Sequence, residues 1–335
     1  MSSGAAVIDR RTFVRLVSTG LAIGSLRANA QQAGKVYRIG YLAGGSAAGS
    51  LAFVEQFREG LREHGWIEGQ NVVIEYRFAE GRFDRLPALA AELVRHKVDI
   101  IAAIPTPAAV AAKNATGTIP IVLMVAVNPL ELGLITSVAR PGGNLTGIAF
   151  SFSTEILGKN LALLKEAIPR VRHVAVLTNP ANPGHTIAIK NMKAAADAMG
   201  VQLSILEVRE PNQFDAAFKV MAEGRAEALF IIADAQFQIH RARLAELAAK
   251  NRLPSMHGFR EYVEAGGLMS YGPNIAASVR HGASFVDRIL RGAKPADLPV
   301  EQPTKFELAI NLKTAKVLGV TIPQSVLLRA EEVMQ

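Results

Sequence analysis

From residue 36 onward the chain alternates short β-branched apolar runs with longer amphipathic stretches, and this alternation limits the possible folds more than any other feature. The predicted strands of the first half are 36–42, 71–76, 98–104 and 119–125, and its predicted helices are 51–65, 83–97 and 107–115. In the first helix Val54, Phe57 and Leu61 recur at the spacing of one helical face. Strands alternating with helices of this length predict βαβ units, with a parallel sheet covered by helices on both faces.

The same order of elements begins again after residue 171. The predicted strands of this second half are 172–179, 201–208 and 226–233, and its predicted helices are 184–200 and 212–223. Short motifs recur at a nearly constant offset, since Phe83-Asp84 matches Phe214-Asp215 and Gly65 matches Gly200. An internal repeat of about 130 residues predicts two similar lobes rather than one long sheet. Chance similarity is the alternative, because any two βαβ halves share such a rhythm.

The last third of the chain does not repeat the pattern. It contains predicted strands at 267–271 and 305–310 and predicted helices at 274–290 and 312–318. These elements are too few for a third sheet, so they must add to the existing lobes. After the loop 140–144, the run 145–150 is a candidate first crossing between lobes, and further crossings are expected near Tyr271 and Pro303. We therefore expect two doubly wound, Rossmann-like α/β lobes joined by a three-strand hinge. Lobe one would be 36–146 plus 274–302, and lobe two would be 147–273 plus 303–335.

Residues 1–30 contain the three parts of an export signal in the correct order. Arg10-Arg11 is a twin-arginine pair, 16–26 is a short apolar stretch diluted by Ser, Thr and Gly, and Ala28-Asn29-Ala30 is a small-x-small cleavage site. We expect a cleavable twin-arginine signal and a periplasmic protein; a mildly basic helix on a cytoplasmic protein is the alternative. The chain has no Cys, which excludes a lipid anchor, a thiol nucleophile and a Cys-based metal site.

Charge and motif content exclude several classes of function. The formal net charge is +8, and removal of residues 1–30, with four Arg and one Asp, leaves about +5. Lys and Arg are scattered along helices with few aromatics between them, so no nucleic acid is expected as a partner. The seven His lack the spacing of metal ligands, and no dinucleotide-binding glycine motif is present, so no metal and no cofactor are expected. Neither a Ser-His-Asp order nor paired carboxylates mark the strand ends, which argues against an enzyme.

Eight short motifs occur in a characteristic order along the chain. They are TPAA (106–109), IPIV (119–122), NP (128–129), RPGGNLTG (140–147), VLTNP (176–180), EAGGLMSYG (264–272), GAKPADLPV (292–300) and INLKTA (310–315). Together they resemble the ABC-transporter substrate-binding family that includes tryptophan- and tyrosine-type binding proteins, over about 36–325. The resemblance implies a type I periplasmic-binding fold, a ligand in the cleft between lobes, and an ABC permease of the inner membrane as partner. In members that bind aromatic amino acids, the resemblance implies an acidic residue at the position of Asn128. Asn does not neutralise an ammonium, so this position argues against a free amino acid as the ligand.

Ligands of open parallel sheets bind beyond the carboxyl ends of the strands. This rule selects Gly45, Ser46, Thr106, Pro107 and Asn128 in lobe one and Ser151, Asn179 and Asp234 in lobe two, with Tyr271 at a crossing. We expect Thr106 to cap a helix that begins at Pro107, whose free amides would bind an anion. Asp234 would pair with a ligand cation, or alternatively cap a helix beginning near Gln236. The neutral residues would bind the ligand or only shape turns, and Tyr271 would stack on the ligand or pack a hinge.

The sequence therefore predicts the substrate-binding component of an ABC importer, a monomer that closes on a small organic solute. The solute would be amino acid-like or a small carboxylate, with its anionic group against lobe one. One alternative is a two-lobe Rossmann-type enzyme such as a sugar-nucleotide transferase. Another is the sensor half of a regulator, which shares this fold.

Overall fold

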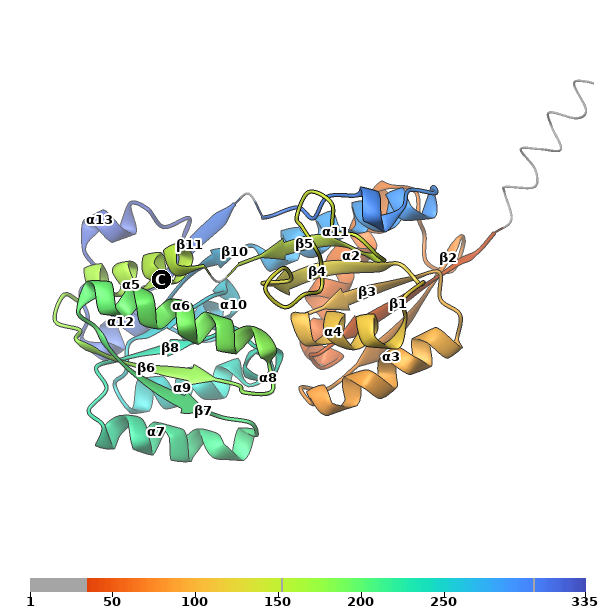
Figure 1. Ribbon diagram of the computed structural model, residues 1–335. Helices are drawn as coiled ribbons and strands as arrows, with labels where there is room; N and C mark the ends of the chain where they lie inside the picture. The colour runs from red at the N-terminus through yellow and green to blue at the C-terminus, as the bar shows by residue number, and fades with distance from the viewer. Residues whose placement is uncertain (1–34, 152, 304) are drawn as a thin grey trace, which may run out of the picture.

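Two β-sheets, each with helices packed on both faces, organise the computed structural model, which describes residues 35–151, 153–303 and 305–335. The predicted export signal lies outside these residues. The first sheet has the strand order β2-β1-β3-β4-β5, and the second, read from its other edge, has the order β7-β6-β8-β9-β10-β11-β12. Figure 1 shows the two sheets side by side, the first in orange to yellow and the second in green to blue. The neighbouring strands run parallel except for the antiparallel pair β10–β11.

The first sheet is built mainly from the N-terminal half of the chain. Its strands are β1 (Tyr37–Ala43), β2 (Val72–Phe78), β3 (Ile100–Ile104), β4 (Ile121–Val127) and β5 (Leu145–Phe150), and its helices are α2 (Leu51–Glu63), α3 (Leu86–Arg95), α4 (Thr106–Ala115) and α11 (Ile275–Leu290). Alternate residues of β1 enter different cores: Ile39 and Tyr41 pack toward α2 and α11, whereas Leu42 packs toward α3 and α4. The sheet is therefore buried on both faces.

Helix α11 comes from the C-terminal third yet lies along α2, as Figure 1 shows. The two helices approach closely at Gly60, where a Cβ would collide with the carbonyl oxygen of Arg280. Glycine lets the two backbones pack at this short separation. The contact ties the first lobe to a segment more than 200 residues later in the chain.

The second sheet and its helices contain most of the remaining residues of the chain. The strands are β6 (His173–Thr178), β7 (Gln202–Glu207), β8 (Ala228–Ile231), β9 (Ser255–His257), β10 (Met269–Pro273), β11 (Phe306–Asn311) and β12 (Glu332–Met334), and the helices are α5 (Thr154–Ala167), α6 (Pro183–Met199), α7 (Phe214–Glu223), α8 (Ala235–Ile239), α9 (Arg241–Lys250), α10 (Arg260–Glu264), α12 (Leu312–Leu318) and α13 (Gln324–Leu327). Short 3-10 turns at Ala48–Ser50, Phe83–Arg85, Pro211–Gln213 and Pro295–Asp297 complete the chain. The sequence predicted no element at α5, α9, α10, α13, β9 or β12, and it offered α8 only as a possible helix beginning near Gln236.

The two sheets repeat one topology. The strands β2-β1-β3-β4 of the first correspond to β7-β6-β8-β9 of the second, so the chain reverses its winding direction between β1 and β3 and again between β6 and β8. The predicted doubly wound α/β architecture is confirmed. At each reversal the loops leaving the strands diverge, which opens a crevice beyond their carboxyl ends.

The chain passes between the sheets three times: after β5, between β10 and α11, and before β11. The first sheet keeps β5 through Phe150, beyond the limit at 146 expected from the sequence, while α12 packs beside α9 and β12. Below, "lobe one" denotes the first sheet with α2, α3, α4 and α11, and "lobe two" denotes the second sheet with its helices.

Candidate ligand-binding site

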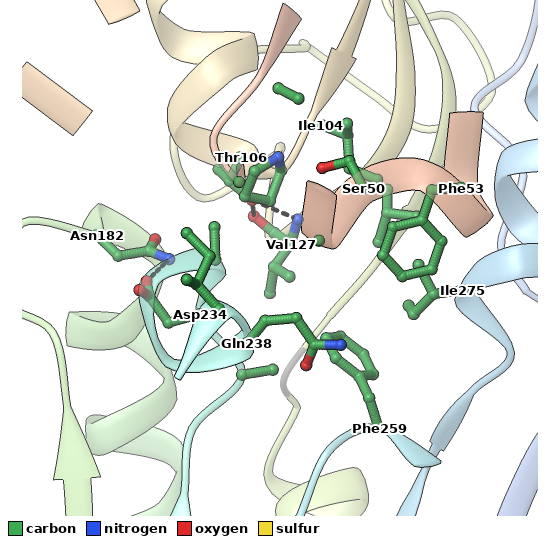
Figure 2. Close-up of a pocket in the computed structure, with 18 of the residues that line it drawn as sticks. Ser50, Phe53, Ile104, Thr106, Val127, Asn182, Asp234, Gln238, Phe259 and Ile275 are labelled. Carbon is green, nitrogen blue, oxygen red and sulfur yellow. Dashed lines mark hydrogen bonds between the residues drawn. The ribbon is translucent and has the colours of Figure 1, made fainter. Parts of the chain in front are cut away.

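A pocket of about 100 Å³ lies where the two reversal points face each other. Its lobe-one wall comes from the ends of β1, β3 and β4 and the start of α2, and its lobe-two wall comes from the starts of α6 and α8. Figure 2 shows these walls, with Thr106, Ser50 and Phe53 opposite Asn182, Asp234 and Gln238. A volume of this kind is several times that needed by one water molecule, so a small organic molecule fits.

Four of the nine predicted site residues line this pocket: Gly45, Ser46, Thr106 and Asp234. The other five lie outside its lining: Pro107, Asn128, Ser151, Asn179 and Tyr271. The four follow β1, β3 and β8, the strands at the reversal points, whereas Asn128, Ser151 and Tyr271 belong to strands farther out in each sheet. Distance from the reversal point accounts for these three residues, whereas Pro107 and Asn179 follow the reversal strands β3 and β6 and are buried there.

The five residues outside the lining have identifiable structural positions. Pro107 is buried in the first turn of α4, and Asn179 is buried behind Asp234. Asn128 is fully buried in a left-handed backbone conformation, φ 52°, and its N–H donates to the carbonyl of Phe150 at 2.9 Å. Ser151 follows β5 at the first crossing. The ring of Tyr271 packs against Phe306 at 5.7 Å on the β10–β11 pair, which is the hinge role considered for it.

Thr106 does not cap α4, contrary to the expectation from the sequence. Pro105 occupies the N-cap position, and the Thr106 hydroxyl accepts a hydrogen bond from the Val127 N–H at 2.8 Å. Thr106 therefore ties the start of α4 to the end of β4. Pro107 has no N–H, and the amides of Ala108 and Ala109 donate to the Pro105 carbonyl, so the first turn offers at most one backbone donor to a ligand.

Asp234 closes the lobe-two wall through a buried hydrogen-bond network. Its Oδ1 accepts from the Gln236 N–H at 3.0 Å, which caps α8, and from Asn179 Nδ2 at 3.1 Å. Its Oδ2 accepts from Asn182 Nδ2 at 3.0 Å. The carboxylate is fully enclosed, with none of its side-chain surface exposed. Asp234 therefore performs the capping role that was the alternative expected from the sequence, and Asn182 lies beside its carboxylate in the same wall of the pocket.

The buried imidazole of His185 leaves this charge uncompensated. His185 Nδ1 accepts from the Asn179 N–H at 3.0 Å, so the proton is on Nε2, which lies 3.1 Å from the Ala233 carbonyl and 3.7 Å from Asp234 Oδ2. Burial lowers the pKa of His185 below its ordinary value, against the opposing effect of Asp234. The histidine is neutral at neutral pH. The negative charge of Asp234 is then held only by neutral donors.

The remainder of the pocket is mostly apolar. Phe53 at the start of α2 and Ile275 at the start of α11 border it on the right in Figure 2, and Phe259 before α10 borders it below. Sequence analysis did not select these residues, because an apolar side chain near a helix start has the same pattern whether it faces a core or a cavity. His257, considered for the cleft, is instead buried against Tyr262 at 4.8 Å and does not line the pocket.

Lobes one and two touch beside the pocket mouth. A Cβ on Gly44 would lie 3.4 Å from Ala235 Cβ, and one on Gly81 would lie 3.1 Å from Ile239 Cδ1. Both partners belong to α8, so this short helix faces the loops after β1 and β2. The pocket is closed on that side by direct contact between the lobes.

Neither a cluster of potential metal ligands nor a helix long and apolar enough to cross a membrane occurs in the described ranges.

Comparison with known proteins agrees with a pocket between two like lobes. Over residues 46–334 the chain matches the family described as ABC transporter substrate binding protein. The chain belongs to this family. The tyrosine-binding protein of Clostridioides difficile (strain R20291) is 26% identical over 262 residues, which cover 78% of this chain and 75% of that protein.

Two solved structures match this substrate-binding protein along nearly its whole length. A conserved domain protein from Vibrio cholerae superposes with a TM-score of 0.84 at 26% identity, covering 89% of this chain and 100% of that one. An ABC domain from Streptococcus pneumoniae in complex with L-Trp gives a TM-score of 0.83 at 26% identity, covering 90% and 100%. The predicted type I periplasmic-binding fold is confirmed. The predicted function as substrate-binding protein of an ABC transporter is also confirmed, over the transferase alternative, and it places the protein outside the cytoplasm.

Proposed function

We propose that this substrate-binding protein captures an amino acid with an apolar side chain in the pocket between its lobes and delivers it to an ABC permease. The observation that carries the proposal is the composition of the pocket, in which an apolar floor adjoins a small polar end. An amino acid has the same division between an apolar body and a compact charged head. Closure of the two lobes would bury both parts and exclude water.

The charges around the pocket favour a zwitterion over a plain carboxylate. Among its described lining residues none is Lys or Arg, so a carboxylate finds no cationic partner there. Ser46, Ser50 and the first amide of α4 are hydrogen-bond donors on the lobe-one wall. The buried charge of Asp234 on the opposite wall attracts an ammonium and repels an anion. An amino acid placed with its carboxylate toward lobe one and its ammonium toward Asn182 and Asp234 satisfies both walls.

The relatives support this solute class. One is named a tyrosine-binding protein and another was solved with L-Trp, and both are 26% identical to this chain. Both solutes combine an amino-acid head with an aromatic body. Phe53 and Phe259 provide rings against which such a body can pack.

We further propose that the mature protein is a freely soluble periplasmic monomer without catalytic activity, exported by the signal at 1–30. The lobe limits 36–146 plus 274–302 and 147–273 plus 303–335 belong to this proposal, with the boundary between 146 and 147 moved to the end of β5 at Phe150. The strand order of the two sheets supports these limits.

Native mass spectrometry of protein purified from its own periplasm would identify the retained solute. Isothermal titration calorimetry with L-tryptophan, L-tyrosine, L-leucine, benzoate and acetate would then compare solute classes. We expect binding of one or more of the amino acids and no measurable binding of benzoate or acetate. A retained solute without an ammonium, or preferential binding of benzoate, would show that the proposed class is wrong.

A further inference from the structure

Gln238 contributes a polar group to the apolar part of the pocket. It lies in α8, and Figure 2 shows its side chain extending from the Asp234 side toward Phe259. The side-chain oxygen is enclosed, and no donor in the described part of the chain bonds to it. The enclosed atom is the oxygen, so the group that lacks a partner is a hydrogen-bond acceptor.

Gln236, on the same helix, has hydrogen-bond partners for both polar atoms of its carboxamide. Its Nε2 donates to the Arg209 carbonyl at 2.8 Å, and its Oε1 accepts from Asn179 Nδ2 at 3.3 Å. Buried side-chain amides in folded proteins normally find such partners, because an unpaired one loses its hydration without compensation. The contrast between two glutamines of one short helix indicates that Gln238 has a partner outside the protein.

A second enclosed polar atom without a partner belongs to a lining residue of the other lobe. The hydroxyl of Tyr41 in β1 is fully buried and has no hydrogen-bond partner within the described ranges. Burial, with a smaller effect from Tyr76, raises the pKa of Tyr41 far above its ordinary value, so the hydroxyl stays protonated. Two residues of the pocket lining, one from each lobe, therefore carry an enclosed polar atom without a partner in the described part of the chain.

The position of Gln238 on α8 decides which part of a solute it meets. Its backbone N–H donates to the Asp234 carbonyl at 2.9 Å, so the two residues lie one helical turn apart on the same side of the helix. Asp234 and Asn182 adjoin the polar end of the pocket, whereas Gln238 reaches Phe259 on the apolar floor. The group that Gln238 meets is therefore carried on the body of the solute, away from its charged head.

We propose that Gln238 determines specificity by accepting a hydrogen bond from a hydroxyl or N–H on the apolar body of the bound solute. This inference rests on the proposed function and narrows its solute class to amino acids with a phenolic or ring N–H donor. Such a site discriminates against an analogue that lacks the donor, because binding of that analogue leaves the enclosed amide oxygen unpaired.

Calorimetry with L-tyrosine and L-phenylalanine isolates this interaction, since the two differ only in one hydroxyl. L-Tryptophan tests a ring N–H. For the unsubstituted mature protein we expect L-tyrosine or L-tryptophan to bind about tenfold or more tightly than L-phenylalanine. Gln238→Met, which keeps the side-chain shape without hydrogen bonding, should reduce that preference to about threefold or less. The exposed Gln202→Met on β7 is the matched control and should keep the preference.

Two results would overturn the role of Gln238. One is equal binding of all three amino acids by the unsubstituted protein. The other is an unchanged preference in a Gln238→Met variant whose melting curve shows that it is folded. If none of the three binds, the amino-acid class of the proposed function is wrong, and the solute retained in native mass spectrometry decides the role of Gln238. A hydroxyl or N–H on its body supports that role, and a plain hydrocarbon body contradicts it.

Discussion

Asn182 Nδ2 donates a hydrogen bond of 3.0 Å to Asp234 Oδ2, and this bond joins the caps of two helices at the wall of the pocket. Asn182 caps α6 by accepting from the Gly184 N–H, and Asp234 caps α8 by accepting from the Gln236 N–H. The same two side chains thus hold both helix starts that form the lobe-two wall. Their geometry is set by one buried carboxylate, which has no cationic partner in hydrogen-bond range among the described residues.

Asp234→Asn should weaken this wall. In the variant an NH2 group replaces one of the two carboxylate oxygens and faces the donor of either Asn179 or Asn182. Two donors cannot bond each other, so at least one buried hydrogen bond is lost. We expect the free energy of unfolding to fall by about 1–3 kcal/mol, measured by denaturant unfolding, together with weaker amino-acid binding. Asp215→Asn on the exposed face of α7 is the control and should change stability little. Stability equal to that of the unsubstituted protein would mean that the network does not stabilise the fold.

Thr106→Val should lower stability rather than act on the solute alone. Valine has nearly the same shape but leaves the Val127 N–H without the acceptor it has in the native protein at 2.8 Å. We expect the free energy of unfolding to fall by about 1 kcal/mol. The decrease should be smaller for Thr106→Ser, because serine keeps the hydroxyl. Thermal unfolding of both variants checks this. A Val variant with native stability but weaker binding would instead support the direct contact with the solute that the sequence alone suggested.

His257 should make the fold less stable in acid. Burial lowers the pKa of His257 from 6.5 to about 3, so the imidazole is neutral in the folded protein. Between these values the unfolded chain binds the additional proton, and the free energy of unfolding should decrease as pH falls, by at most about 1.4 kcal/mol per pH unit. Above about pH 6.5 this effect disappears. Burial lowers the pKa of His185 as well, which acts in the same direction.

Denaturant unfolding at a series of pH values measures this dependence. His257→Gln should show a shallower decrease between pH 6.5 and 3 than the unsubstituted protein, although its stability at pH 7 also changes. Gln202→Met, at an exposed position of β7 without a titratable group, should keep the native slope. Identical slopes for the His257 variant and the unsubstituted protein would contradict the assignment of a neutral, buried imidazole.

Gly44→Ala should impair closure of the two lobes. The new methyl group would lie 3.0 Å from Phe83 Cε1 and from Pro105 Cδ, and 3.4 Å from Ala235 Cβ across the cleft. Relief of the crowding within lobe one pushes its loops toward α8. We expect solute affinity to fall about tenfold, measured by calorimetry, with a smaller effect on melting. Gly117→Ala, whose methyl group would meet no atom within 4 Å, is the control. Equal affinities for the two variants would argue against a tight approach at Gly44.

Replacing Arg10 and Arg11 together with Lys should block export, because the twin-arginine route depends on this pair. We expect the precursor to remain in the cytoplasm at full length, as detected by cell fractionation and mass measurement. Arg15→Lys is the control and should be exported normally. Periplasmic, processed protein from the double variant would point to the general secretory route instead.

Local patterns predicted the order of the elements well, because helix and strand periodicities are properties of neighbouring residues. The helix expected at 312–318 has those bounds. The run 145–150, expected to cross between the lobes, is instead the edge strand β5 of the first sheet. The short elements α8, β9 and α10 had no comparable signal. Their few residues do not complete a periodic pattern, and packing against the second sheet decides their form.

The sequence by itself determined that two like α/β lobes form and that polar residues follow their strands. Gly45, Ser46, Thr106 and Asp234 were therefore within reach of sequence analysis. Only the tertiary structure decided which strand ends meet, because the order of strands in each sheet places the β1–β3 crevice opposite the β6–β8 crevice and leaves Asn128 and Ser151 outside. It also decided that Phe53 and Gln238 face a cavity rather than a core. That orientation depends on how two separate lobes approach each other, a long-range relationship that no local pattern of residues specifies.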